Sequence, residues 1–312
     1  MHYVKINCCI SANLERMIDV TNLIITLIQG LSLGSIYALI ALGYTMVYGI
    51  AKMLNFAHGD VIMVGAYMIF SSVALAKLPS IVGIILCVVF SSLLGIIIEL
   101  LAYKPLRRAP SLSVLITAIG VSYLLQNLAL LIFGSEPQAV PVLFNLPFVE
   151  LGYGIKITGE AMFTMGITVV LMIILTIFIN KTKLGKAMRA VSEDKDAALL
   201  MGIDVNKTIS ITFAIGSALA ALASTLMMLD GQTVNFTMGS LPGIKAFTAA
   251  VIGGIGSIPG AMLGGIVLGL IECFAVMVGL GDYAVAIEFS ILIIVLLVKP
   301  TGILGKKRRE KV

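Results

Sequence analysis

Long apolar segments alternate with short polar segments along almost the whole chain. Several of the apolar segments approach the roughly 20 residues that a helix needs to cross a bilayer. A transmembrane β-barrel would instead show alternating segments of about ten residues. The pattern therefore predicts an all-α, polytopic integral membrane protein with about eight or nine transmembrane helices. The expected spans are residues 22–47, a second ending near 75, 81–102, 111–133, 161–179, 209–229, 261–278 and 283–298.

Two apolar stretches, 43–60 and 243–260, are interrupted by glycines and polar residues. In the second, residues 244–252 are too few for a full span, so this stretch either crosses the membrane or re-enters it. Irregular backbone at membrane depth survives only beside protein or water, and transporters place substrate sites at such half-helices. Plain turns between helices are the alternative. Candidate residues of a translocation pathway are Asn55, His58, Gly59, Thr248, Gly253 and Gly254.

A long polar stretch, 181–208, separates two spans and holds six of the chain's 21 Lys and Arg residues. It predicts a short amphipathic helix, which Ser192 can cap and Gly202 can end. Ala197, Leu200 and Met201 follow an i, i+3, i+4 spacing that makes one small apolar face. A helix of this kind suits docking into a partner's groove, whereas an ordinary solvated loop is the alternative. The candidate docking residues are Asp196, Ala197, Ala198 and Gly202.

The charged residues are few and unevenly placed. Only 12% of residues are charged, against about one-quarter in soluble domains, which agrees with an integral membrane protein. Sixteen of the 21 basic residues fall in four segments, which the positive-inside rule places in the cytoplasm together with the C-terminus. Orientation thus accounts for the net charge of +5 without a nucleic-acid partner. The four segments are 49–60, 103–110, 181–207 and 299–312.

Three carboxylates lie within or near spans, where such groups are functional candidates by default. Glu99 is followed within one to three helical turns by Lys104, Arg107 and Arg108, which can neutralise it. Glu272 and Glu288 would be proton or cation sites if the chain were an ion-coupled transporter or channel that works alone.

The sequence lacks several motifs of catalytic chemistry. It contains no G-x-x-x-x-G-K-[ST] phosphate loop. Its two histidines and four cysteines have neither metal-ligand spacing nor an arrangement suited to nucleophilic catalysis. We therefore expect a transport subunit that is not itself an enzyme, holds no metal or cofactor, and takes its energy from another chain.

Three motifs are long and specific: residues 54–68 with their lead-in 43–49, the sequence KAFTAAVIGGIGSIPGA at 245–261, and KPTGILG at 299–305. They resemble the inner-membrane permease of branched-chain amino acid ABC transporters. The resemblance covers about 22–305, which we assign as the permease domain, with an N-terminal tail over 1–21 and a basic tail over 306–312. Residues 1–16 have no counterpart and are either an upstream extension or a disordered tail.

Residues 196–202 resemble the Glu-Ala-Ala-x-x-x-Gly coupling motif of bacterial ABC permeases. Here Asp196 replaces the Glu, and the Ile-x-Leu-Pro that usually follows is absent. The resemblance implies a bacterial inner-membrane location, a heterodimer with a second related permease, two cytoplasmic ATP-binding subunits that bind the ATP, and an extracytoplasmic amino-acid-binding protein. The implied cargo is leucine, isoleucine or valine. A permease for urea, short amides or another amino acid is the alternative within the family.

Overall fold

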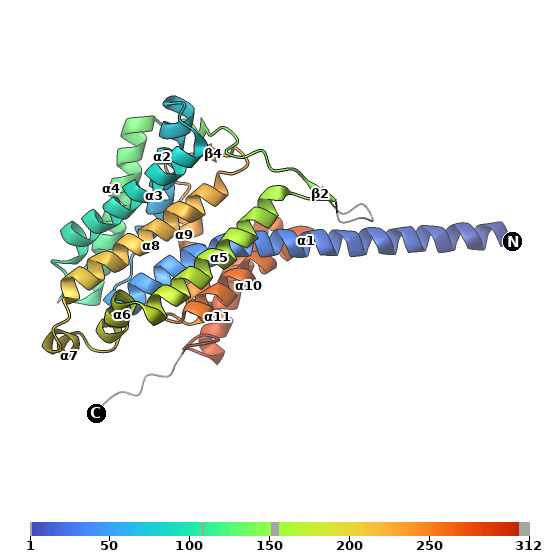
Figure 1. The fold of residues 1–312 in the computed structure, drawn as a ribbon. Coiled ribbons are helices and arrows are strands. Elements are labelled where there is room, and N and C mark those ends of the chain that lie inside the picture. The colour runs from blue at the N-terminus through green and yellow to red at the C-terminus, as the bar shows by residue number, and fades with distance from the viewer. Residues whose placement is uncertain (1, 108, 151–155, 306–312) are drawn as a thin grey trace.

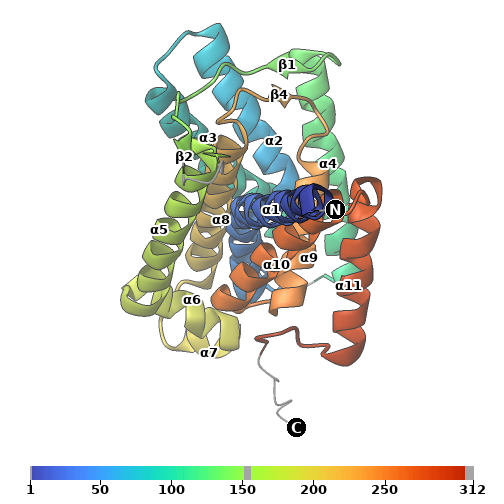
Figure 2. The same cartoon turned by 90° about the vertical axis from the view of Figure 1, so that its right-hand side faces the viewer.

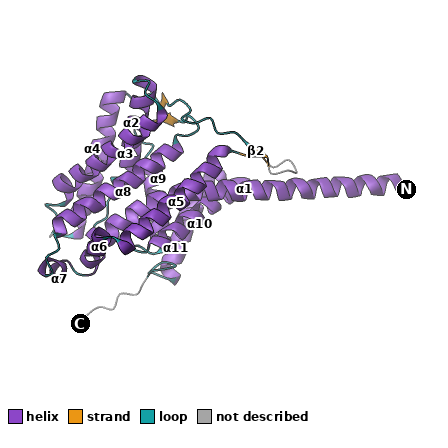
Figure 3. Ribbon diagram, in the orientation of Figure 1, coloured by secondary structure: helices purple, strands orange, loops and turns teal. Residues whose placement is uncertain are grey.

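The computed structural model describes residues 2–107, 109–150 and 156–305, and for 2–19 the backbone alone. These residues form a bundle of helices (Figure 1), and the extended pieces among them are four two-residue strands (Figure 3). Within them, eight helices are long and apolar enough to cross a membrane, and one further apolar helix is shorter. The all-α, polytopic fold expected from the sequence is confirmed.

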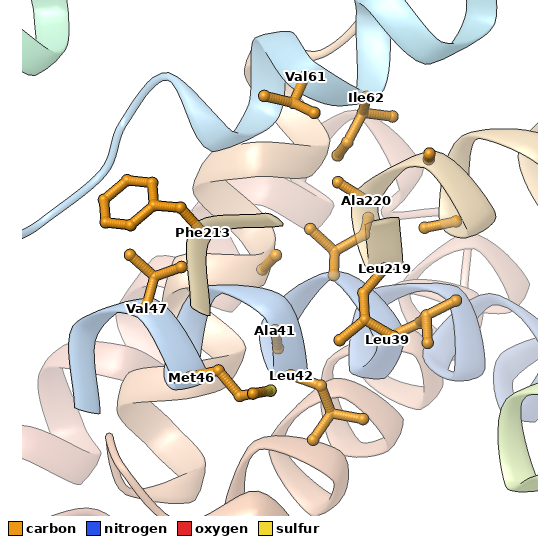
Figure 4. Close-up of a cluster of buried hydrophobic side chains, with 14 of the residues drawn as sticks. Leu39, Ala41, Leu42, Met46, Val47, Val61, Ile62, Phe213, Leu219 and Ala220 are labelled. Carbon is orange, nitrogen blue, oxygen red and sulfur yellow. The ribbon is translucent and has the colours of Figure 1, made fainter. Parts of the chain in front are cut away.

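Helix α1 (His2–Ala51) runs through the middle of the bundle from one end of the molecule (Figure 2). Its second half packs against α2 (His58–Ile69) and α8 (Val205–Met227), and Figure 4 shows the apolar side chains that meet there. The helix also includes residues 2–21, which we set apart as a tail. That residues 1–16 are an upstream extension stays a prediction.

Small residues let α1 approach α10 (Ile258–Met277) closely. A Cβ atom added to Gly34 would lie 2.7 Å from the Cα atom of Ile266. Gly30 faces Leu270 in the same way. The close approach expected from the Gly30-x-x-x-Gly34 spacing is therefore present, and backbone contacts of this kind stabilise helix pairs in membranes.

Of the next three spans, the first two pack against α8 and against each other, and the third packs on the outside of the first. Two of them end in a π-helical segment, the wider winding often found as a local bulge in α-helices. Their bounds lie within a few residues of the expected spans. They are α2 continued by η1 (Phe70–Leu75), α3 (Ser80–Ile98) continued by η2 (Glu99–Tyr103), and α4 (Ser111–Phe133).

Short strands connect the loops at one end of the bundle, which we call the β1 end. β1 (Gln138–Ala139) pairs antiparallel with β4 (Thr233–Val234), so the loop after α4 lies beside the loop after α8. β2 (Val149–Glu150) pairs with β3 (Lys156–Ile157) in the same long loop.

The opposite end, which we call the α7 end, holds the predicted docking stretch. The chain reaches it through the span α5 and turns there into two short helices before α8 returns. Residues 299–305 lie at the same end, because the backbone N–H of Ile303 donates to the carbonyl of Ile252, 2.8 Å away, and the basic tail expected over 306–312 lies outside the described residues. The helices are α5 (Gly159–Lys181), α6 (Lys183–Glu193) and α7 (Lys195–Leu200).

The second irregular stretch crosses the bundle. After β4 at the β1 end, the chain descends without regular structure to α9 (Ser240–Gly253), which ends at the α7 end. Gly254 (φ +106°) and Gly256 (φ +91°) then turn the chain through conformations that favour glycine. Ser257 caps α10, which therefore begins before the expected residue 261. The 3₁₀ turn η3 (Gly281–Tyr283) and the last span α11 (Ala284–Val298) follow.

Candidate functional site

Helix α7 is capped at both ends by its own residues. The Asp194 side chain accepts from the backbone N–H groups of Asp196 and Ala197, each at 3.0 Å. The cap predicted at Ser192 is wrong, because Ser192 lies inside α6 and its hydroxyl donates to the carbonyl of Arg189. The extended backbone of Asp194 separates the two helices and so places its carboxylate where a cap is needed.

Gly202 ends α7 as predicted, with φ +79°. The backbone N–H of Gly202 donates to the carbonyl of Leu199, and that of Ile203 donates to the carbonyl of Ala198. These two bonds form a Schellman motif, which satisfies carbonyl groups left free at a helix end. The motif fixes the C-terminal end of the docking helix in one conformation.

The predicted apolar face of α7 is exposed, whereas the neighbouring Ala198 is buried. Leu200 is 88% exposed and Met201 82% exposed, and Ala197 is exposed beside them. Ala198, by contrast, is only 3% exposed and packs against the chain itself. The surface available to a partner is therefore the Leu200–Met201 side, and Ala198 supports it from beneath.

Lys195 connects α7 to the end of α1. Its ammonium group donates to the carbonyl of Ala51 over 2.9 Å. Burial lowers the pKa of this ammonium below its usual range, and the nearby positive charge of Arg107 lowers it further, while Asp196 acts in the opposite direction. The docking helix is thus attached to the last residue of α1, which lies within the first irregular stretch.

A buried glutamate lies next to this region. Glu99 is fully buried and forms an ion pair with Arg107, as the charge pattern predicted. Its other carboxylate oxygen accepts from the Ser210 hydroxyl at 2.6 Å, and Arg107 also donates to Asn206. These four residues, which we call the Glu99 cluster, join η2 to the start of α8 and form a structural ion pair.

The six predicted pathway residues are all buried inside the chain. Asn55 is held by the Tyr103 hydroxyl, which donates to its side-chain oxygen at 2.9 Å. Gly59 packs directly against the backbone of Gly239 and Gly243, so the two irregular stretches meet where α2 and α9 begin. Their positions indicate close packing rather than an open channel within this chain. Buried in this way are Asn55, His58, Gly59, Thr248, Gly253 and Gly254.

A second group of buried charges joins four helices. Lys245 on α9 lies 2.7 Å from a carboxylate oxygen of Glu272 on α10 and 3.2 Å from one of Glu288 on α11. Tyr37 on α1 donates its hydroxyl to Glu272 at 2.8 Å. We call these residues the Lys245 cluster. Both glutamates were candidates from the sequence, whereas Lys245 was not, although a lysine inside an otherwise apolar half-helix is a signal that could have found it.

A further polar group, which was not expected from the sequence, lies beneath α4. The side-chain amide of Gln126 donates to Asp60 on α2 at 2.9 Å and to Ser240, the first residue of α9, at 3.2 Å. Asp60 is 1% exposed. The hydrogen bonds hold the buried carboxylate and tie α4 to both irregular stretches. Gln126 could have been found as an amide in the middle of an apolar span.

Comparisons with known proteins agree with this architecture. Residues 26–296 match the family "Branched-chain amino acid transport system / permease component". The chain is 45% identical over 297 residues to "High-affinity branched-chain amino acid transport system permease protein BraD" of Pseudomonas aeruginosa, covering 92% of this chain and 97% of that protein. It is 44% identical over 295 residues to the LivH permease protein of the same description from Escherichia coli K12, covering 91% and 96%.

The fold has a counterpart among solved structures. The structure described as "PsaBC from Streptococcus pneumoniae in complex with Fab" contains a chain that superposes with a TM-score of 0.50 over 92% of this chain and 97% of that one. Its 18% identity supports a likeness of fold alone. The family match and the two close relatives together show that this chain belongs to the permease family of branched-chain amino acid transport systems.

Proposed function

We propose that this chain is one of two permease subunits of an ATP-binding-cassette importer that moves leucine, isoleucine or valine across the bacterial inner membrane. The names of its relatives support the cargo. Separate cytoplasmic subunits bind and hydrolyse the ATP, a second related permease completes the membrane unit, and an extracytoplasmic binding protein delivers the amino acid. Urea, short amides and other amino acids are the alternative cargoes.

The exposed apolar surface of α7 is the observation that carries this proposal. Leu199, Leu200 and Met201 are each more than half exposed on a helix that lies outside the membrane spans. Exposed apolar side chains cost free energy in water, and burying a leucine in a partner recovers about 2 kcal/mol. A rigid, doubly capped helix with such a face suits insertion into a groove on an ATPase.

Charge distribution supports a cytoplasmic α7 end. Among the described residues, the loops at the β1 end carry Lys77 and Lys156, whereas most of the other basic residues outside the spans lie at the α7 end. Such asymmetry orients membrane proteins with the basic side in the cytoplasm. The basic residues at the α7 end are Lys52, Lys104, Arg107, Lys181, Lys183, Lys186, Arg189, Lys195, Lys207 and Lys299.

The rival function, an ion-coupled transporter that works alone, would use Glu272 and Glu288 as cation sites. Both carboxylates lie within ion-pair distance of Lys245. A lysine ammonium in this position occupies the place that a transported cation would take. This arrangement favours the importer over the rival.

Uptake by the reconstituted complex tests the proposal. Radiolabelled leucine uptake into proteoliposomes that contain both permeases, the ATPases and the binding protein should require ATP inside the vesicle. A complex with hydrolysis-deficient ATPases is the control and should give no accumulation. Concentrative uptake driven by a proton or sodium gradient without ATP would support the rival function instead.

A variant pair tests the docking surface. Leu200→Glu should reduce ATPase co-purification and coupled hydrolysis by roughly tenfold or more, because it replaces an apolar contact of about 2 kcal/mol with a charge. Leu184→Glu on α6 is the matched control, since Leu184 is 41% exposed at the same end of the molecule. Normal hydrolysis and ATPase binding by Leu200→Glu would remove α7 as the docking helix.

A further inference from the structure

The outward faces of the spans differ in polarity, and this difference points to the side on which the cargo moves. On α3, every exposed residue from 80 to 98 is isoleucine, valine, leucine or phenylalanine. On α5, the exposed residues from 162 to 177 are methionine, glycine, valine and isoleucine. Faces of this composition are suited to lipid, so α3 and α5 face the bilayer.

The outward face of helix α4, in contrast, carries polar side chains within the span. Tyr123 is 63% exposed near the middle of the span, and Asn127 is exposed one turn later. The Asn127 side-chain amide donates to the carbonyl of Tyr123 at 2.7 Å, and the oxygen of this exposed side chain has no hydrogen bond to a described residue. An amide oxygen that faces hydrocarbon costs several kcal/mol. Protein or water must therefore cover this face.

Polar groups continue from this face into the chain. Directly behind it, Gln126 binds Asp60 and Ser240. Between β4 and α9 the backbone descends without regular structure, and Thr237 is exposed along it. Irregular backbone at membrane depth is tolerated where it is buried in protein or lines a water-filled space. The same side of the molecule thus carries two independent features that lipid does not accommodate.

Helices α4, α9 and α11 share this side. Figure 2 shows α9 on the same side of the molecule as α4 and α11, and the hydrogen bond from Gln126 to Ser240 and the ion pair from Lys245 to Glu288 join α9 to both helices. The short helix α9 exposes Leu241 and Ile244. Gly120 on α4 has no atom within 4 Å of an added Cβ, which leaves room for another helix to approach.

We propose that the face formed by α4, α9 and α11 packs against the second permease and borders a hydrated translocation path, with Tyr123 and Asn127 lining it. This inference rests on the proposed function, which supplies a second membrane-spanning chain. The polar residues lie within the span, so a soluble partner such as a binding protein cannot cover them. The path would then run between two chains. This agrees with the close packing, inside this chain, of the six residues that the sequence suggested as its lining.

Two exposed glycines provide matched variants. Gly120 on α4 and Gly166 on α5 both lie within 23-residue helices, and an added Cβ meets no atom within 4 Å at either position. In the full complex, Gly120→Leu should reduce co-purification of the second permease at least tenfold. Gly166→Leu should leave it unchanged, because the larger side chain meets lipid. Loss of the second permease from Gly166→Leu but not from Gly120→Leu would overturn the proposed face.

Cysteine accessibility tests the hydrated path in the assembled complex. In a variant whose four native cysteines are replaced by alanine, Asn127→Cys should react with a charged, water-soluble thiol reagent at least tenfold faster than Ile173→Cys on α5. Equal rates would overturn the path. A photo-crosslinker at Leu124 should join the second permease, and an adduct between two copies of this chain would overturn the assigned partner. If no second permease co-purifies with the unaltered chain, the proposed function fails instead.

Discussion

Two clusters bury glutamate in this protein, and they differ in how the charge is balanced. In the Glu99 cluster, one carboxylate faces one guanidinium, and Ser210 satisfies the second oxygen. In the Lys245 cluster, a single ammonium faces two carboxylates, and the Tyr37 hydroxyl donates to Glu272 and accepts from Lys245. The first cluster is neutral and lies near the α7 end. The second carries two formal negative charges against one positive charge, inside the spans.

The difference lies in what each cluster joins. The Glu99 cluster connects η2 with α8 beneath the docking helix, over two neighbouring elements. The Lys245 cluster connects α1, α9, α10 and α11 through one side chain. Helix α11 buries only Ala284 and Glu288 along its length, so its attachment depends strongly on Lys245. A lysine whose contacts join four helices is therefore more critical to the fold than an arginine whose contacts join two elements.

The largest effect is expected from Lys245→Met. This change leaves Glu272 and Glu288 without a counter-ion in a region of low dielectric. Removing one partner of a buried ion pair costs about 3–5 kcal/mol, so we expect poor assembly and a large fall in the melting temperature of the detergent-purified complex. Lys207→Met at an exposed position is the control.

A triple variant shows whether charge is the cause. Adding Glu272→Gln and Glu288→Gln to Lys245→Met removes the unpaired carboxylates and should recover much of the lost stability. If Lys245→Met were as stable as the unaltered protein, the cluster would have no part in holding α11.

A smaller loss is expected from Arg107→Met, about 2–3 kcal/mol, because Glu99 keeps its hydrogen bond from Ser210. Arg107→Lys retains the charge but loses the planar guanidinium that reaches both Glu99 and Asn206. Its stability should therefore lie between that of the unaltered protein and that of Arg107→Met. Thermal melting of the purified complex measures both variants. A larger loss from Arg107→Met than from Lys245→Met would reverse the ranking of the two clusters.

The two clusters also show which contacts could be predicted from the sequence and which could not. Glu99 and Arg107 are eight residues apart, on either side of the end of η2, so their pairing could be predicted from closeness in the sequence. Lys245 pairs with residues on other helices, and no periodicity fixes which helices are neighbours. The spans, the glycine breaks and the end of α7 at Gly202 depend on local composition and were predicted well. The exposed side of α7 and the polar face of α4 depend on tertiary packing and required the structure.

Neutralising one glutamate in each cluster should lower stability by different amounts. Glu288→Gln should cost less than about 1 kcal/mol, because Glu272 still pairs with Lys245 and the excess negative charge is removed. Glu99→Gln should cost more, since it leaves Arg107 without its partner. Denaturation midpoints of the two variants, compared in the same detergent, give the difference. A greater loss from Glu288→Gln would mean that the second carboxylate is structurally required.

The smallest expected effect is on the pKa of Lys195, which lies on the docking helix and is near the positive charge of Arg107 in the Glu99 cluster. Burial is the main reason that the pKa of Lys195 is lowered, and the positive charge of Arg107 adds to it. A lower pKa means that more of the amine is neutral, and hence reactive, at a given alkaline pH. In Arg107→Gln the repulsion disappears while the burial remains, so the pKa of Lys195 should rise but stay below its usual value of 10.5. The pH profile of Lys195 acetylation, followed by mass spectrometry with the exposed Lys156 as an internal standard, should therefore shift to higher pH. A profile that did not move would mean that the charge of Arg107 does not reach α7, and that the Glu99 cluster acts on the docking helix through packing alone.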